Sequence, residues 1–600
     1  MGFNTATIAA HTTGTVFKTF FVHYLNQNAL KDKPSKQLSY HEGFALISKF
    51  LEYASHHTVE EIQSFTSMHV PASPRVLVQN VDVPEEIIEN AGDILATNLG
   101  PEGLERVGGR RWWMYRRKKL QIQIVEPKEV VGTKNLLMYV HGGAYYFGST
   151  DEHRYQIQRH ARKCNSRAYA PRYRLAPQYP FPCGLLDILA CYLHLLTISS
   201  PSRILLSGDS AGGSLILATL CILRDSSIPL PSGASLISPW VDLTHSFPSI
   251  LDKDTDDYIP AHGFIHKPSI TWPPPTIEDL EAVQNESLKA EETSVQEAKS
   301  GQVKPVERIR IELDGTMVEI KEQIQLYASN ELLDFPLVSP VLQASLGGLC
   351  PLFIVGRKGF ATKSYSDDCL SPLKRRELER YPPTQVYLQV YDSCCHVTPA
   401  LSFTKPAKYM YRAVANFHIW ALNESRFTSS SSIKHISKNP KGIISDFTKS
   451  IIRERVDING NIRAMECTSE IPCLNIDKNI IGVVKPGPIR LWLDGKSKWD
   501  KKYHSVKSQV QTLRAKSYAQ AKKNGFLGGM FGDERPPLSS IAALQDPEEI
   551  RIVGTKNLLM YVHGGAYYFG SYISLLGTIA DPRTDEHRYQ IQRHARKCNS

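Results

Sequence analysis

The sequence predicts an α/β fold, a mostly parallel sheet with helices on both faces, and three observations support this prediction. Short β-forming runs alternate with helical patterns over residues 118–417, as in parallel sheets. The apolar run 204–206 leads into Gly-Asp-Ser-Ala-Gly-Gly, and the apolar run 136–140 ends in His-Gly-Gly. Because ligands bind at the carboxyl ends of parallel strands, we expect both motifs at the functional edge of the sheet.

The serine between glycines, Ser210, has the sequence context of a nucleophile. A G-x-S-x-G sequence between a buried strand and a helix forms a sharp turn that presents the hydroxyl at the edge of the sheet. We expect a helix from Ala211 to Leu223 whose amino end faces the serine and favours negative charge there. The alternative interpretation is a serine in an ordinary surface turn.

The amides of Gly142, Gly143 and Ala211 are the predicted donors of an oxyanion hole. Such donors stabilise the negative charge that develops on an acyl carbonyl oxygen under attack. His141 precedes the tight loop on this donor side, so we expect it to bond the backbone and shape the loop rather than act as a base.

His396 is the predicted general base. Residues 383–391 alternate as a strand does, and His396 follows the end of this segment. In hydrolases with this serine motif the chain order is serine, acid, histidine. The alternative is a core histidine satisfied by the backbone. We interpret Cys394 and Cys395 as buried thiols rather than metal ligands, since no C-x-x-C pair accompanies them.

With these motifs the chain resembles the hormone-sensitive-lipase-like family of α/β-hydrolases (alpha/beta hydrolase fold-3), in particular its fungal branch. The similarity covers roughly residues 110–420 and rests on five motif regions, namely 141–149, 173–177 with 180–182, 208–213, 238–243 and 392–397. The resemblance implies the α/β-hydrolase fold and a serine carboxylester hydrolase, an esterase or lipase with an acyl-enzyme intermediate, no cofactor and no metal. It assigns the nucleophile, the base and the amide donors to the residues named above. Plant gibberellin receptors resemble this family but lack the histidine, so His396 favours catalysis over binding alone.

The position of the acid departs from the family pattern. The family has carboxylates shortly after the strand matched by residues 350–355, whereas residues 356–366 contain none. Asp367 and Asp368 are the candidates from a longer loop. Loss of the acid costs a factor of order 10⁴ in rate in such triads. Two hypotheses therefore stay open: a reading-frame error across this window, and a catalytically impaired, lipid- or metabolite-binding pseudoenzyme on the same fold.

The last part of the chain copies an earlier part. Residues 553–571 repeat residues 131–149, and residues 584–600 repeat residues 150–166, without one substitution. The copy ends before any serine motif, so it cannot form a second site. We interpret 553–600 as a partial duplicate of 131–166 rather than an independent domain, with a gene-model fault as the favoured origin.

The rest of the chain divides into a helical segment at 1–110, a hydrolase domain at 111–420, an insertion within it at 245–335, and a polar basic tail at 421–550. The family resemblance implies that the segment at 1–110 is associated with a lid over the site, and the alternative is a docking segment without substrate contact. In the first segment we expect helices at 38–53 and 58–65, the second opened by a capping box of Thr58 and Glu61. The insertion is a lid or a surface loop, and its residues 308–320 predict a hairpin with an Asp-Gly turn.

Four aromatic residues near the motifs either line an acyl pocket or belong to the core, namely Tyr145, Tyr146, Phe147 and Trp240.

Composition and charge limit the partners. The formal net charge is +10, and residues 485–523 hold eleven Lys or Arg against Asp494 and Asp500. Helical spacing of Trp499 and the apolar residues after it predicts a basic amphipathic helix, docked on the hydrolase body or resting on anionic lipid. No nucleic-acid motif accompanies the charge. We therefore expect a small-molecule ester or lipid substrate, no nucleic acid, and a peripheral membrane contact through 485–523 as the second possibility.

The 11 cysteines are scattered and odd in number, which argues against a disulfide framework. No signal peptide and no run of about 20 apolar residues is evident. The expected location is intracellular, cytoplasmic or peripheral on a membrane or lipid droplet.

Overall fold

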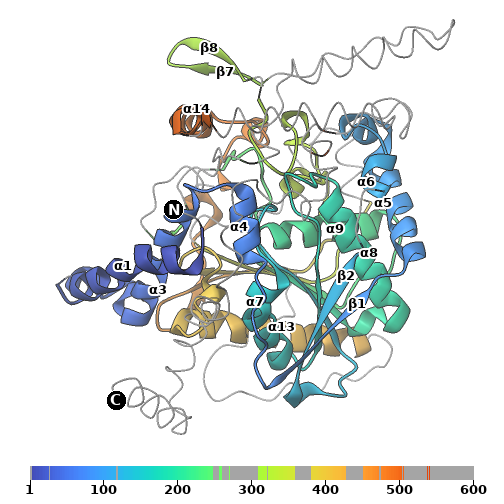
Figure 1. Cartoon of the computed structure of the whole chain (residues 1–600). Helices are drawn as coiled ribbons and strands as arrows, with labels where there is room; N and C mark the ends of the chain where they lie inside the picture. The colour runs from blue at the N-terminus through green and yellow to red at the C-terminus, as the bar shows by residue number, and fades with distance from the viewer. Residues whose placement is uncertain are drawn as a thin grey trace, which may run out of the picture.

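A ten-stranded sheet forms the centre of the protein (Figure 1). The computed structural model describes residues 3–25, 27–115, 119–247, 256–259, 269, 309–320, 322–357, 380–427, 451–471, 474–502, 504–505, 537 and 540. The strand order is β1-β2-β4-β3-β5-β6-β9-β10-β11-β12. The strands of this sheet are β1 (Val76–Asp82), β2 (Gln121–Pro127), β3 (Leu136–Val140), β4 (Arg167–Pro171), β5 (Ile204–Asp209), β6 (Gly233–Ile237), β9 (Leu352–Arg357), β10 (Val386–Tyr391), β11 (Ile451–Val456) and β12 (Ile462–Ala464).

The strands from β4 to β11 pair in parallel, while β1, β2 and β12 pair antiparallel at the two edges. The central strands β3 and β5 are buried along their whole length, as the continuous apolar runs predict for a parallel sheet covered on both faces. The sheet takes β1 from the segment before residue 111 and β11 and β12 from the segment after residue 420.

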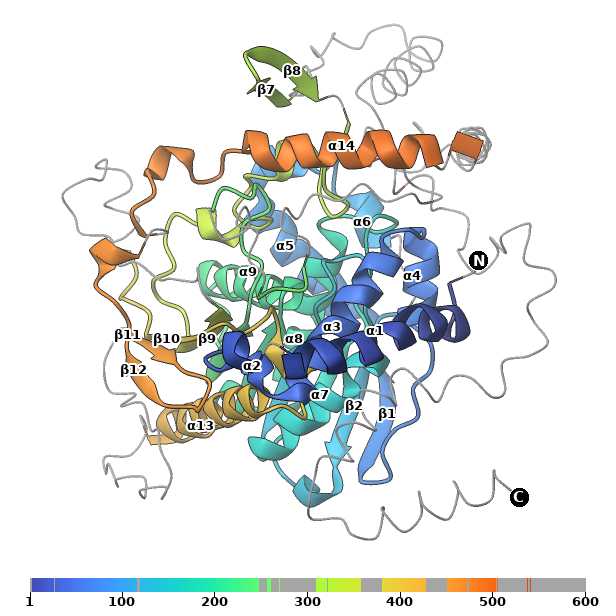
Figure 2. The ribbon, with the colours of Figure 1, turned by 90° about the vertical axis from the view of Figure 1, so that its left-hand side faces the viewer.

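Helices cover both faces of the sheet (Figures 1 and 2). On one face α5, α8 and α9 contribute to the larger core cluster, and on the other α7 and α13 contribute to a second cluster. The α-helices are α1 (Thr5–Leu25), α2 (Gln27–Leu30), α3 (Leu38–Ala54), α4 (Val59–Thr66), α5 (Glu85–Arg106), α6 (Arg111–Tyr115), α7 (Thr150–Lys163), α8 (Cys183–Ile198), α9 (Ala211–Asp225), α13 (Lys405–Phe427) and α14 (Pro486–Lys502).

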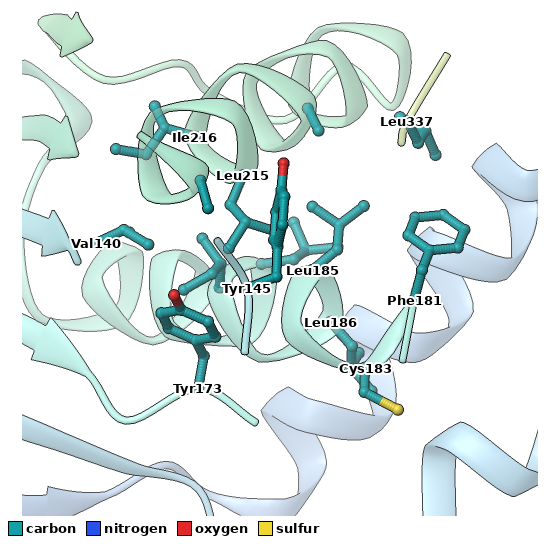
Figure 3. Packing of buried hydrophobic residues seen from close by; sticks show 14 of the residues in the cluster. Val140, Tyr145, Tyr173, Phe181, Cys183, Leu185, Leu186, Leu215, Ile216 and Leu337 are labelled. Atoms are coloured by element: carbon teal, nitrogen blue, oxygen red, sulfur yellow. The ribbon is translucent and has the colours of Figure 1, made fainter. Parts of the chain in front are cut away.

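The core between α8 and α9 supports the edge of the sheet where the motifs lie. Figure 3 shows Leu185 and Leu186 of α8 and Leu215 and Ile216 of α9, with Tyr145 between the two helices. These side chains are at most 2% exposed. Their close packing fixes α9, and with it the residue that precedes α9, against β3 and β5.

Several local predictions are confirmed. Thr58 and Glu61 form the capping box at the start of α4. The hairpin of the insertion consists of β7 (Ile309–Leu313) and β8 (Thr316–Ile320), and Asp314 and Gly315 both have positive φ, as a two-residue turn of this kind requires.

The basic amphipathic helix exists over Pro486–Lys502 as α14. It is docked on the body: Ile489, Trp492 and Trp499 are buried, and Lys496 pairs with Glu322. In the described residues no helix is long and apolar enough to cross a membrane. The predictions for 506–536, 541–550 and the duplicate at 553–600 lie outside the described residues.

Candidate active site

Ser210 lies at the sharp turn between β5 and α9. Its φ of 50° and ψ of −119° are a backbone conformation that a residue with a side chain adopts only under constraint. A Cβ on Gly208 would lie 2.8 Å from the carbonyl carbon of Gly212, and one on Gly212 would lie 2.2 Å from the oxygen of Val140. Both glycines are therefore required for the strand, the turn and the helix to approach this closely, as the motif predicts.

Hydrogen bonds from the neighbouring strand hold the serine in this conformation. The Ser210 N–H donates to the oxygen of Ile237 at the end of β6 (2.9 Å), and the Trp240 N–H donates to the oxygen of Ser210 (3.0 Å). Below the turn, the Tyr139 hydroxyl donates to Asp209 Oδ1 at 2.8 Å, and burial raises the pKa of Tyr139. The backbone that carries the hydroxyl is thus fixed from both sides.

The His-Gly-Gly loop lies against Ser210. A Cβ on Gly142 would lie 3.1 Å from Ser210 Cβ and 2.9 Å from the oxygen of Asp209. Gly143 has a φ of +116° and accepts hydrogen bonds from the amides of Tyr146 and Phe147, both at 3.0 Å. The structure therefore brings together the predicted nucleophile and the loop that carries two of the predicted amide donors. The third, Ala211, is the first residue of α9.

His141 has the loop-shaping contact that the sequence predicts. Its Nδ1 lies 2.7 Å from the oxygen of Gly142, and the Tyr173 hydroxyl donates to the His141 main-chain oxygen at 3.0 Å. Burial lowers the pKa of His141 to about 3, so the ring is neutral near pH 7.

The N-terminal helix α4 fixes the far side of this loop. The Gly148 N–H donates to Thr66 Oγ1 at 3.2 Å, and the Ser149 hydroxyl donates to the Thr66 oxygen at 2.5 Å. Gln63 Nε2 donates to the oxygen of Tyr146 at 2.8 Å. Sequence reasoning assigned α4 only to a lid-associated segment, because no motif marks contacts between residues some 80 positions apart.

His396 lies in the connection from β10 to α13, three strand positions from β5 in the sheet. The next residue, Val397, donates its N–H to Ser238 Oγ at 3.3 Å, and Ser238 lies between the two residues that bond the Ser210 backbone. The preceding residue, Cys395, donates its N–H to the Tyr40 hydroxyl at 2.8 Å. These contacts tie the His396 connection to the carboxyl edge of β6, beside the serine turn.

The carboxylate that contacts residue 396 is one that the sequence analysis missed. The His396 N–H donates to Asp257 Oδ1 at 3.1 Å. Asp256 pairs with Lys33 at 2.8 Å, which ties this short segment to the N-terminal region. Asp257 follows β6 by 20 positions with no motif around it, so no sequence signal could have found it. The predicted acids Asp367 and Asp368 lie outside the described residues.

Tyr258, the next residue, joins the same segment to the histidine connection. Burial raises its pKa, and the nearby carboxylates of Asp257 and Asp209 raise it further. Its ring packs with Tyr40 and Cys395 in a small core cluster. Asp257 and Tyr258 thus both lie against the histidine connection.

The two cysteines before His396 are buried thiols, as predicted. Burial raises the pKa of Cys395 to about 12, which leaves it protonated and weakly nucleophilic at neutral pH.

Of the four aromatic residues weighed as pocket lining, Tyr145 belongs to the core, where it stacks on Tyr327 with ring centroids 3.8 Å apart.

Comparison with known proteins agrees with this architecture. A family model described as alpha/beta hydrolase fold (Abhydrolase_3) matches residues 137–266, which include the His-Gly-Gly loop, the serine turn and Asp257. The chain has the α/β-hydrolase fold.

An acetyl-hydrolase of Streptomyces hygroscopicus is 43% identical over 108 residues, 18% of this chain and 36% of that protein. An esterase of Acinetobacter venetianus is 35% identical over 120 residues, 20% of this chain and 40% of that protein. The chain thus spans well under two thirds of the length of these relatives. Among solved structures, a crystal structure of EstE5 is 21% identical, with a TM-score of 0.40, over 63% of this chain and 98% of that one.

Proposed function

We propose that the protein is a serine carboxylester hydrolase that acts through an acyl-enzyme intermediate. The observation that supports this most directly is the close approach of the Gly142 loop to Ser210, at the amino end of α9. Acyl transfer requires main-chain amides beside the attacking hydroxyl, and this close approach supports the amides of the loop in that role. The names of the matched relatives, acetyl-hydrolase and esterase, support the same class of reaction.

In the proposed reaction the Ser210 hydroxyl attacks the carbonyl carbon of an ester, and His396 takes the hydroxyl proton. The carbonyl oxygen becomes an oxyanion, which accepts hydrogen bonds from the amides of Gly142, Gly143 and Ala211. His396 then gives the proton to the departing alcohol, and the acyl group stays on Ser210. Water, deprotonated by His396, attacks this acyl-enzyme. The bond between the acyl carbon and Ser210 Oγ then breaks, His396 returns the proton to Ser210, and the acid is released.

We further propose Asp257 as the carboxylate that positions His396. Support comes from its hydrogen bond to the His396 main-chain amide. The role proposed for Asp257 is that of the acid in a triad, which orients the imidazole and stabilises the imidazolium. Asp367 and Asp368 stay the alternative acids.

The matched variants Asp257→Asn and Asp256→Asn test this assignment. We expect Asp257→Asn to lower kcat at least about a hundredfold and to change the pH profile of kcat/KM, because the imidazolium loses its partner. Asp256→Asn, which removes only the pair with Lys33, should keep most of the activity. Normal activity of Asp257→Asn, with inactivation by Asp367→Asn or Asp368→Asn, would assign the acid to the longer loop.

The finer assignments belong to the same proposal. These are membership of the hormone-sensitive-lipase-like family and its fungal branch, a small-molecule ester or lipid substrate, and an intracellular, reducing location. Support for the last comes from the cysteines that the structure describes, all of which are free thiols. The comparisons give no support to the pseudoenzyme alternative.

Turnover of a short-chain p-nitrophenyl ester by the Ser210→Ala variant tests the function itself. We expect turnover to fall to the buffer rate while circular dichroism and Tm stay close to those of the wild type. Unchanged turnover would refute the assignment of Ser210 as nucleophile. A wild-type protein that turns over no ester of any chain length would refute the function.

A further inference from the structure

Helix α1 exposes most of its large apolar side chains, whereas its buried face consists of one isoleucine, two threonines and one histidine. Five large residues are exposed: Phe17 (65%), Phe20 (43%), Phe21 (66%), Tyr24 (54%) and Leu25 (83%). Four others are buried: Ile8, Thr12, Thr19 and His23. At about 100° per residue, the exposed set spans an arc of about 140°, and the buried set lies on the opposite side. A helix that served only to pack on the body would show the reverse pattern.

The exposed residues form one continuous face. The Phe20 ring packs edge-on against Phe21, with centroids 5.9 Å apart, and against Tyr24, with centroids 4.9 Å apart. The spacing 17, 20, 21, 24, 25 keeps all five on one side of the helix. An apolar patch of this kind marks an interaction surface.

The charges around this face indicate the kind of partner. The first carboxylate in the sequence is Asp32, so residues 3–25 carry no acidic side chain, while Lys18 lies among the exposed residues of α1. Phe and Tyr are enriched where proteins meet the boundary between lipid headgroups and acyl chains. The exposed face of α1 itself carries Lys18 and no carboxylate, which is complementary to a membrane with anionic headgroups. The carboxylates of the neighbouring helix α3, Glu42 and Glu52, lie near His23 and His11, outside the aromatic face.

We propose that α1 docks the protein on the surface of an anionic phospholipid membrane. The helix lies parallel to the surface, with Phe17, Phe20 and Phe21 inserted at the boundary of the acyl chains. Figure 2 shows α1 on the outside of the molecule, along α3. In the α14 part of the predicted basic segment, by contrast, the apolar side chains Ile489, Trp492 and Trp499 are already buried against the body.

Contacts from the same region reach the candidate site. Helix α1 packs along α3, and Tyr40 of α3 accepts the hydrogen bond from Cys395 beside His396. The docking face and the candidate base are therefore joined through one helix. The further inference that the membrane supplies the ester substrate rests on the proposed function. The inference that α1 docks on a membrane does not rest on it.

Co-sedimentation of the full chain with vesicles tests the proposal. The probes are vesicles of phosphatidylcholine alone and of phosphatidylcholine with phosphatidylserine. The test variant is Phe17→Ser/Phe21→Ser, and the matched control is Met317→Ser on β8, which is 65% exposed like Phe17. We expect the wild type to bind, with preference for phosphatidylserine. The double variant should partition at least about tenfold less, since each buried Phe contributes strongly to insertion. The control variant should bind as the wild type does.

Each other outcome overturns the proposal. Wild-type protein that stays in the supernatant, or a double variant that still sediments, would remove α1 as the lipid-binding face. Binding lost completely at high salt would assign it to the basic segment 485–523, because insertion of an apolar face survives screening. A wild-type dimer by light scattering that the double variant dissociates, without vesicle binding, would make the face a contact between two copies. The Ser210→Ala variant should bind vesicles normally, so failure of docking and failure of the hydrolase function are distinguishable.

Discussion

Substitution of Gly142 by alanine adds one methyl group at the point where the predicted oxyanion loop meets the nucleophile. The new Cβ would lie 2.3 Å from Asp209 Oδ2, 2.9 Å from the Asp209 oxygen and 3.1 Å from Ser210 Cβ. The Asp209 carboxylate cannot easily move away, because it is 3% exposed and accepts the hydrogen bond of Tyr139. Gly142 is not among the glycines with positive φ, so the penalty is steric rather than conformational.

The magnitude follows from these contacts. The loop must retreat by about 0.5 to 1 Å, and a displacement of this size costs roughly 10²-fold in rate. If the retreat also removes one amide donor, the loss reaches about 10²–10³-fold, or about 2.7–4 kcal/mol. We expect a smaller loss of folding stability, about 1–3 kcal/mol, as for other overpacked sites.

Steady-state hydrolysis of p-nitrophenyl acetate measures the effect. We expect Gly142→Ala to lower kcat and kcat/KM together, because the lost hydrogen bond forms only in the transition state. Gly495→Ala in α14 is the control, since a Cβ there meets nothing within 4 Å. A Gly142→Ala enzyme within about threefold of the wild-type kcat would refute the assignment of this loop as the oxyanion hole.

Three further predictions concern the scaffold of the site. Thr66→Val leaves the Gly148 N–H without its acceptor. We therefore expect the free energy of unfolding in urea to be about 1–3 kcal/mol lower, and kcat to be reduced. Wild-type values for both quantities would contradict the role of α4. Asp187→Ala leaves the buried Arg174 guanidinium without its carboxylate and should lower the free energy of unfolding by about 3–5 kcal/mol. A decrease of less than about 1 kcal/mol would contradict this prediction. Burial lowers the pKa of His418 to about 3. Between about pH 6.5 and 3 the unfolded chain therefore binds a proton at this histidine that the folded chain does not bind. The contribution of His418 to the free energy of unfolding thus decreases by about 1.4 kcal/mol for each unit by which the pH falls. His418→Leu should lessen that slope, whereas identical slopes in urea unfolding would show that His418 titrates normally.

The parts of the fold and site that the sequence predicts are those with a local signal. The buried strands β3 and β5 are continuous apolar runs, and each leads into a motif whose glycines leave no room for a side chain. The α4 capping box and the Asp-Gly turn of the β7–β8 hairpin are likewise set by residues a few positions apart. In each case neighbouring residues determine the conformation, so one sequence suffices.

The parts that escaped prediction depend on contacts between distant segments. Strands β1, β11 and β12 are partly exposed and polar, so their addition to the edges of the sheet has no clear periodic signal. Asp257 lies beside His396 only because the chain after β6 returns to the histidine connection. The exposed aromatic face of α1 is invisible in the sequence, because the pattern alone does not show which side of a helix packs on the protein.

Covalent labelling of the native protein with a fluorophosphonate tests the central claim most directly, because only an activated serine hydroxyl reacts at a useful rate. Peptide mass spectrometry should find one adduct, on Ser210, and the rate of labelling should fall at least about 10³-fold in His396→Ala. An adduct on another serine, or a His396→Ala protein that labels as fast as the wild type, would contradict the pairing of these two residues.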